Sequence, residues 1–110
     1  MEDDRLLRIQ KLNDLLRCQH LGGRVVITAG VQVLGLDDID KLLKAIADFK
    51  AFSSHNDPWG EHDCSTITHN GQRYIWKIDY YDKTLSFHST DSADPKVTER
   101  VLTVMRSDEY

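Results

Sequence analysis

The chain has 110 residues, of which 40% are hydrophobic and 29% charged, and its formal net charge is -4. This size and composition predict one globular domain over residues 1–110, and the sequence contains no apolar run long enough to cross a bilayer. The acidic balance argues against direct binding to a nucleic-acid backbone, and the acidic start "MEDDRLLRIQ" is unlike a secretion signal, so we expect a cytoplasmic protein.

The first part of the chain is predicted to form a helix and then a strand. Leucine and isoleucine recur every three to four residues within 3–20, which is typical of an amphipathic helix that ends at Gly22-Gly23. The β-branched run 24–28, "RVVIT", predicts a short buried strand. The segment 29–35 either extends this strand or turns through Gly30.

A second helix is expected after this segment. Asp37 or Asp38 can act as its N-cap, and five apolar residues at helical spacing form its buried stripe. These residues are Ile39, Leu42, Leu43, Ile46 and Phe49.

The next predicted feature is a β-hairpin. Asn70-Gly71 separates "STITH" from "QRYIWKIDYY", and both residues of this dipeptide tolerate a positive φ angle. Alternation in the second strand places four residues on its core face. They are Tyr74, Trp76, Ile78 and Tyr80.

The last part of the chain is predicted to add one strand and one helix. In "TLSFHS", Leu85 and Phe87 alternate as inward residues of a strand. Asp94-Pro95 then resembles a helix start, followed by Val97, Val101, Leu102 and Met105 at helical spacing. The order α-β-α-β-β-β-α predicts a single α+β domain with an antiparallel sheet of about four strands packed against helices.

The segment between the second helix and the hairpin concentrates metal-ligand residue types. A zinc hydrolase or nuclease needs about three such ligands and an open position for water. No His-Glu-x-x-His or Cys-x-x-Cys spacing occurs here, so the fold itself would have to assemble a site. The ligands in this alternative are His55, Asp57, Glu61, His62 and Asp63.

The same segment is also typical of an ordered loop. Asn56, Asp57 and Pro58 open a turn, and Trp59 can pack against the edge of the core. A carboxylate within the loop would then accept N–H groups and close it. We favour this interpretation, which implies no cofactor and makes the loop a binding surface. The candidate binding residues are His55, Asn56, Asp57, Trp59, Glu61, His62, Asp63, and Asp79 and Tyr81 of the long strand.

Several motifs together resemble the DUF3768 family of small bacterial proteins, which are often met on plasmids and other mobile elements. The segments are "LNDLLR", "GGRVVITAGV", "FSSHNDPWGEHDCSTI", "WKIDYYDKTL" and "DPKVTERVLTVMRSDEY", which span the chain from Leu12 to Tyr110. The resemblance implies no catalytic residues. Family members usually carry an aromatic residue where Cys64 stands here, which argues against Cys64 as a ligand or nucleophile.

These observations favour a binding protein over an enzyme. We expect an accessory factor of a bacterial mobile element that binds a host protein. Its most specific form is an inhibitor of a host defence nuclease, in the manner of an anti-CRISPR protein. The alternative is a metal-dependent hydrolase or nuclease that uses the loop from His55 to Asp63.

Overall fold

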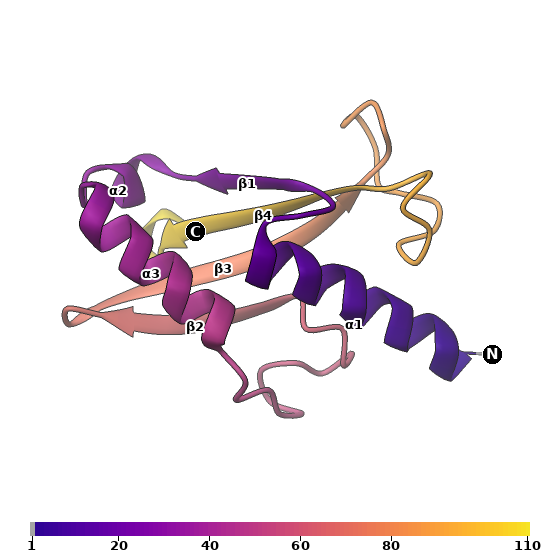
Figure 1. The fold of residues 1–110 in the computed structure, drawn as a ribbon, viewed down its shortest axis with the longest axis horizontal. Coiled ribbons are helices and arrows are strands. Elements are labelled where there is room, and N and C mark those ends of the chain that lie inside the picture. Colours follow the sequence, from indigo (N-terminus) through magenta and orange to yellow (C-terminus); the bar gives the residue numbers. More distant parts are fainter. Residues whose placement is uncertain (1) are drawn as a thin grey trace.

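The computed structural model describes residues 2–110, in which helices dominate the first half of the chain and strands the second (Figure 1). The first half contains α1 (Glu2–Gln19), β1 (Arg24–Ile27), α2 (Ala29–Gln32) and α3 (Leu36–Asp48). The second half contains β2 (Cys64–His69), β3 (Gln72–Tyr81), β4 (Glu99–Arg106) and the short 3-10 helix η1 (Ser107–Glu109). Together they form the predicted single α+β domain.

The strands form one four-stranded sheet in the order β1-β4-β3-β2. The pairs β2–β3 and β3–β4 are antiparallel, whereas β1 runs parallel to β4. The prediction of a wholly antiparallel sheet was therefore wrong at the β1 edge. The reason is that α2 and α3 carry the chain across the sheet before β2 begins, and the two reversals that follow leave β4 pointing the same way as β1.

The predicted last helix is wrong, because residues 99–106 form the inner strand β4. The segment has an alternating pattern as well as a helical one, and Arg100, Leu102 and Val104 all point into the core. Its valines and threonine favour a strand that is paired on both sides. Asp94, the predicted start of the helix, instead closes a turn by accepting the backbone N–H of Lys96 at 2.9 Å.

The predicted strand at residues 84–89 is also wrong, because this segment is a loop. The Asp82 carboxylate accepts the backbone N–H groups of Thr84 and Ser86, both at 3.1 Å, and so folds the chain into a turn. Leu85 has a φ of 61° and is exposed, as is Phe87, so neither lies inward as predicted.

The segment 29–35 turns rather than extending β1, since it contains the short helix α2. Gly35, with a φ of 86°, then leads into α3. No side chain caps this helix, and Asp37 and Asp38 lie in its first turn instead of at the N-cap. No helix among residues 2–110 combines the length and apolar character needed to span a membrane.

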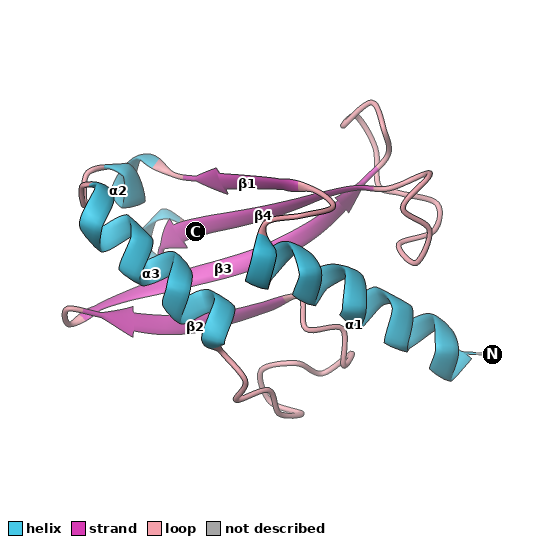
Figure 2. Cartoon of the chain, viewed as in Figure 1, coloured by secondary structure: helices cyan, strands magenta, loops and turns pink. Residues whose placement is uncertain are grey.

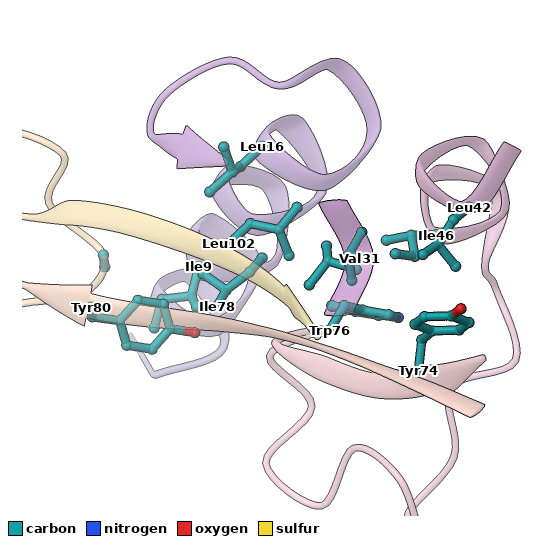
Figure 3. Packing of buried hydrophobic residues seen from close by; sticks show 12 residues of the cluster. Ile9, Leu16, Val31, Leu42, Ile46, Tyr74, Trp76, Ile78, Tyr80 and Leu102 are labelled. Atoms are coloured by element: carbon teal, nitrogen blue, oxygen red, sulfur yellow. The ribbon is translucent and has the colours of Figure 1, made fainter. Parts of the chain in front are cut away.

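Helices α1 and α3 lie on the same face of the sheet, and the core fills the space between (Figures 2 and 3). Trp76 is completely buried at its centre, and the predicted core face of β3 is confirmed. The hairpin tip is confirmed too, because Asn70 and Gly71 have φ angles of 50° and 76°. The core residues contributed by the helices include Ile9, Leu16, Leu42 and Ile46.

Candidate functional site

The predicted functional segment is a loop over residues 49–63, between α3 and β2, which we call the clamped loop. The backbone N–H of Asp57 donates to the Ser53 carbonyl at 2.8 Å, and that of Gly60 donates to the Asp57 carbonyl at 3.0 Å. The Asn56 side chain accepts the Ser53 N–H and donates to the Ala51 carbonyl at 2.9 Å. Two consecutive turns therefore fix the course of the loop from within.

Asp57 closes this loop, as predicted for one of its carboxylates. Its side chain is buried and accepts the backbone N–H of His62 at 3.1 and 3.3 Å. His62 itself has a φ of 57°, an uncommon conformation for a residue with a side chain. The carboxylate thus supplies an acceptor for the half-buried backbone N–H of a residue in an uncommon conformation.

The His62 ring joins the clamped loop to α1. It stacks on Phe52, with ring centroids 4.1 Å apart and planes within 6° of parallel. Its Nδ1 atom lies 3.2 Å from both carboxylate oxygens of Asp14, which also accepts a hydrogen bond from Arg17 at 2.9 Å. Arg17 in turn donates to three backbone carbonyls at the end of α3, at distances of 2.8 to 3.0 Å. One chain of polar contacts thus holds α1, α3 and the loop together.

A pocket of about 490 Å³ lies beside these contacts. Its walls carry carboxylate, guanidinium, imidazole and aromatic groups. The Cys18 thiol also lines it, but this thiol donates to the Ala47 carbonyl at 3.3 Å. The polar lining residues are Asp14, Arg17, Cys18, Lys50 and His62.

A second polar network lies on the other side of the loop, inside the core. The Tyr80 hydroxyl donates to the Glu61 carboxylate at 2.7 Å and accepts from the Asn13 amide at 2.7 Å. The same amide nitrogen donates to the Glu61 carbonyl at 3.0 Å, and the Asn13 oxygen accepts from Arg100 at 2.9 Å. Burial, reinforced by the Glu61 carboxylate, raises the pKa of Tyr80, so its hydroxyl is held as a donor.

Trp59 does not anchor the loop on the core, contrary to our prediction. Its side chain is 77% exposed, and its neighbour Pro58 is exposed too. The reason is that Asp57 and the His62 ring already fill the inner side of the loop, and this leaves the indole on the outer side. His55 is exposed as well.

Asp63, at the end of the clamped loop, forms a separate group with Asp79 and Tyr81 of β3. A pocket of about 280 Å³ is lined by these three side chains and His88. Burial first, and then the carboxylates of Glu61, Asp57 and Asp79, raise the pKa of Asp63. Burial and the Asp63 carboxylate likewise raise the pKa of the Cys64 thiol, which disfavours a reactive thiolate at this position.

The alternative metal site is not assembled by this geometry. Over residues 2–110, no group of three or more histidine, cysteine or acidic side chains is placed to hold one metal ion. The Asp57 and Glu61 carboxylates instead face N–H and O–H donors within the domain. The predicted ligands are therefore divided between the inside of the loop, its outer surface and the edge of the sheet.

Sequence reasoning missed the residues of α1 that hold the loop. Asn13 and Arg17 lie on the same stripe as the buried residues Ile9 and Leu16, and all four are buried. Polar residues at core positions of a helix are rarely left unpaired. This interruption of the apolar stripe was the available signal, and it pointed to partners elsewhere in the chain.

The fold and the site define a small α+β domain with one loop clamped from both sides. The chain belongs to the DUF3768 family, whose model matches residues 27–109 and describes a protein of unknown function. The clamped loop lies within the matched region, whereas α1, which holds it, lies before it. Neither a curated protein nor a solved structure matches the chain.

Proposed function

We propose that this protein acts by binding another protein, with Trp59 on the clamped loop as the central contact. The exposure of this side chain carries the proposal. Tryptophan is enriched among the few residues that contribute most of the free energy of binding at protein interfaces. An indole at 77% exposure gives little to the stability of its own fold, so a role in binding explains its position.

The rigidity of the loop supports the same function. Its backbone is fixed by its own turns, by Asp57 and by side chains of α1, including Gln10, which donates to the Gly60 carbonyl. A contact loop that is already ordered loses little conformational entropy when it binds. The half-buried Asp57–His62 and Glu61–Tyr80 contacts therefore serve binding indirectly, by fixing the direction of the indole.

Charge indicates the chemistry of the partner. The chain has a net charge of -4 and presents the exposed indole of Trp59. A basic protein surface with an apolar hollow would complement this combination. Nucleases carry such basic surfaces where they bind phosphate groups. The specific form of the proposal is thus a cytoplasmic factor of a bacterial mobile element that inhibits a host defence nuclease.

The general proposal is tested by affinity capture from lysate of a bacterial host, followed by mass spectrometry. The variants are Trp59→Ser and, as a matched control, Phe87→Ser, since Phe87 is 74% exposed on a different loop. We expect Trp59→Ser to lose the captured protein and Phe87→Ser to keep it. With purified partner, Trp59→Ser should raise Kd at least about 30-fold, equivalent to about 2 kcal/mol.

Equal capture by the wild type and Trp59→Ser would refute the loop as the contact surface. The specific form has its own test, which is the survival of a targeted plasmid in cells with an active defence nuclease. Expression of the wild type should protect the plasmid, whereas Trp59→Ser should not. A partner without nuclease activity would leave the binding function standing and reject this specific form.

A further inference from the structure

The face of the sheet opposite α1 and α3, which we call the open face, carries several apolar side chains around its centre. In β3 and β4 the side chains that alternate with the core residues point to this side, since neighbouring residues of a strand face opposite ways. Val26 of β1 adds an apolar side chain that is 44% exposed. The apolar members of this face that are at least partly exposed are Val26, Ile75, Tyr81 and Val101, whereas Met105 points to the same side but is buried.

Two opposite charges lie in the middle of this face. The Lys77 ammonium forms an ion pair with the Asp79 carboxylate, and the two side chains are 32% and 36% exposed. They are two residues apart on one strand and so project on the same side. A groove of about 310 Å³ runs beside them, bordered by Ile75, Cys64 and the exposed Tyr110. The pair is therefore accessible from outside.

We propose that two copies of this chain associate through their open faces, about a twofold axis that runs perpendicular to the strands and passes over β3 between Lys77 and Asp79. The axis lies in the plane between the two sheets, so that the β3 strands face each other in opposite directions. Each Lys77 then lies against Asp79 of the second copy, which gives a ring of four alternating charges. A strand on which lysine and aspartate alternate in this way is complementary to itself under such an axis.

Two further pairs of positions on β3 and β4 agree with this arrangement. The same axis places Ile75 opposite Tyr81 of the second copy, and Val101 opposite Thr103 of the second copy. Apolar and aromatic side chains thus surround the central charges, as in many sheet-on-sheet contacts. Strands of 4, 6, 10 and 8 residues cover about 450 Å² in projection. Protruding side chains raise the accessible area further, toward the roughly 800 Å² per partner of a standard interface.

The test measures molar mass in solution, by light scattering after size-exclusion chromatography, over a range of protein concentrations. The wild type should reach twice the monomer mass of 12.7 kDa. Lys77→Asp and Asp79→Lys should each place like charges across the axis and raise the dimer Kd at least about tenfold. An equimolar mixture of these two variants restores opposite charges and should form a heterodimer. The double variant Lys77→Asp with Asp79→Lys should form a homodimer again.

The ion pair Lys44–Asp48 on the outer side of α3 supplies the control. Lys44→Asp and Asp48→Lys make the same charge changes away from the open face and should leave the dimer intact. Thermal melting of every variant shows whether the monomer still folds. If one single variant fails to fold, the double variant still tests the proposal, because it should form a homodimer. A wild type that stays monomeric up to about 1 mM overturns the proposal. So does a dimer that Lys77→Asp and Lys44→Asp affect equally.

Discussion

Arg100 on β4 donates a hydrogen bond from its Nε atom to Oδ1 of Asn13 on α1, across 2.9 Å. Both side chains are buried, and the Arg100 guanidinium also lies over the Tyr80 ring, 5.1 Å from its centre. Tyr80 completes the link by donating to Glu61 at 2.7 Å. The position of the clamped loop therefore depends on how α1 is seated on the sheet.

Asn13→Leu should lower the free energy of unfolding by about 2–4 kcal/mol, measured by urea denaturation. Leucine has a similar volume, so the loss arises from polar groups rather than from a cavity. Arg100 Nε would lose the acceptor that it has in the wild type. Lys11→Leu, at an exposed position of the same helix, is the control and should change stability by less than about 0.5 kcal/mol. Equal effects of the two variants would contradict the role of the network.

Trp76→Ala should cost about 3–5 kcal/mol, because the side chain is fully buried at the centre of the core. Trp76→Phe should cost much less, at about 1 kcal/mol. The indole Nε1 atom has no hydrogen-bond partner among the described residues, so phenylalanine also removes an unpaired buried donor. Chemical denaturation of both variants provides the comparison, and a Trp76→Ala protein as stable as the wild type would mean that this side chain is not buried.

The parts of the fold that could be predicted from sequence are those with one dominant periodicity. The stripe of α1, the alternation of β3 and the Asn70-Gly71 turn each favour a single structure, and each is confirmed. The segment 99–106 has helical and strand periodicity at once. The segment becomes a strand because it pairs with β1 on one side and with β3 on the other. This pairing involves residues far away in the chain, so it could not be read from the segment itself.

The candidate site was predictable to the same extent. The turn chemistry of Asn56 and Asp57 is local, so the ordered loop followed from a few neighbouring residues. The outward orientation of the Trp59 side chain could not be predicted from its neighbours in the sequence. It depends on Asp57 and the His62 ring filling the inner side, and that ring is held in place by Asp14 of α1, far away in the chain.

Gly71→Val should destabilise the domain by about 1–3 kcal/mol, because a β-branched residue resists the positive φ of 76° at this hairpin position. Gly71→Asn is the matched control, since asparagine tolerates this conformation and should cost less than half as much. A Cβ added here has no atom within 4 Å beyond its chain neighbours, so the loss should arise mainly from the backbone conformation. Thermal melts of the two variants separate these outcomes. Identical melting temperatures would reject the turn geometry.

Asp63→Asn should stabilise the protein at neutral pH but not in acid. The raised pKa of Asp63 means that the fold favours its protonated form, so its contribution to stability is complete below the ordinary value of 3.8. This contribution is lost as the pH rises through the folded-state pKa. Asparagine stays neutral, so the variant should melt a few degrees higher than the wild type at pH 7 and equally at about pH 3. The control is Asp40→Asn at an exposed position of α3, and a gain independent of pH would contradict the assignment.

Asp57→Ala should destabilise the loop and Trp59→Ala should not, because the Asp57 carboxylate holds the loop in place whereas the Trp59 side chain is exposed to solvent. Removal of the Asp57 carboxylate leaves the His62 N–H without its acceptor and should cost about 1–3 kcal/mol. Hydrogen exchange of residues 53–62 should accelerate in this variant, whereas Asp57→Asn, which keeps an acceptor oxygen, should show a smaller change. Trp59→Ala should alter neither exchange nor stability by more than about 0.5 kcal/mol, since the side chain is exposed. If Trp59→Ala instead destabilises the fold as much as Asp57→Ala, the indole has a structural role and the binding proposal loses the observation that carries it.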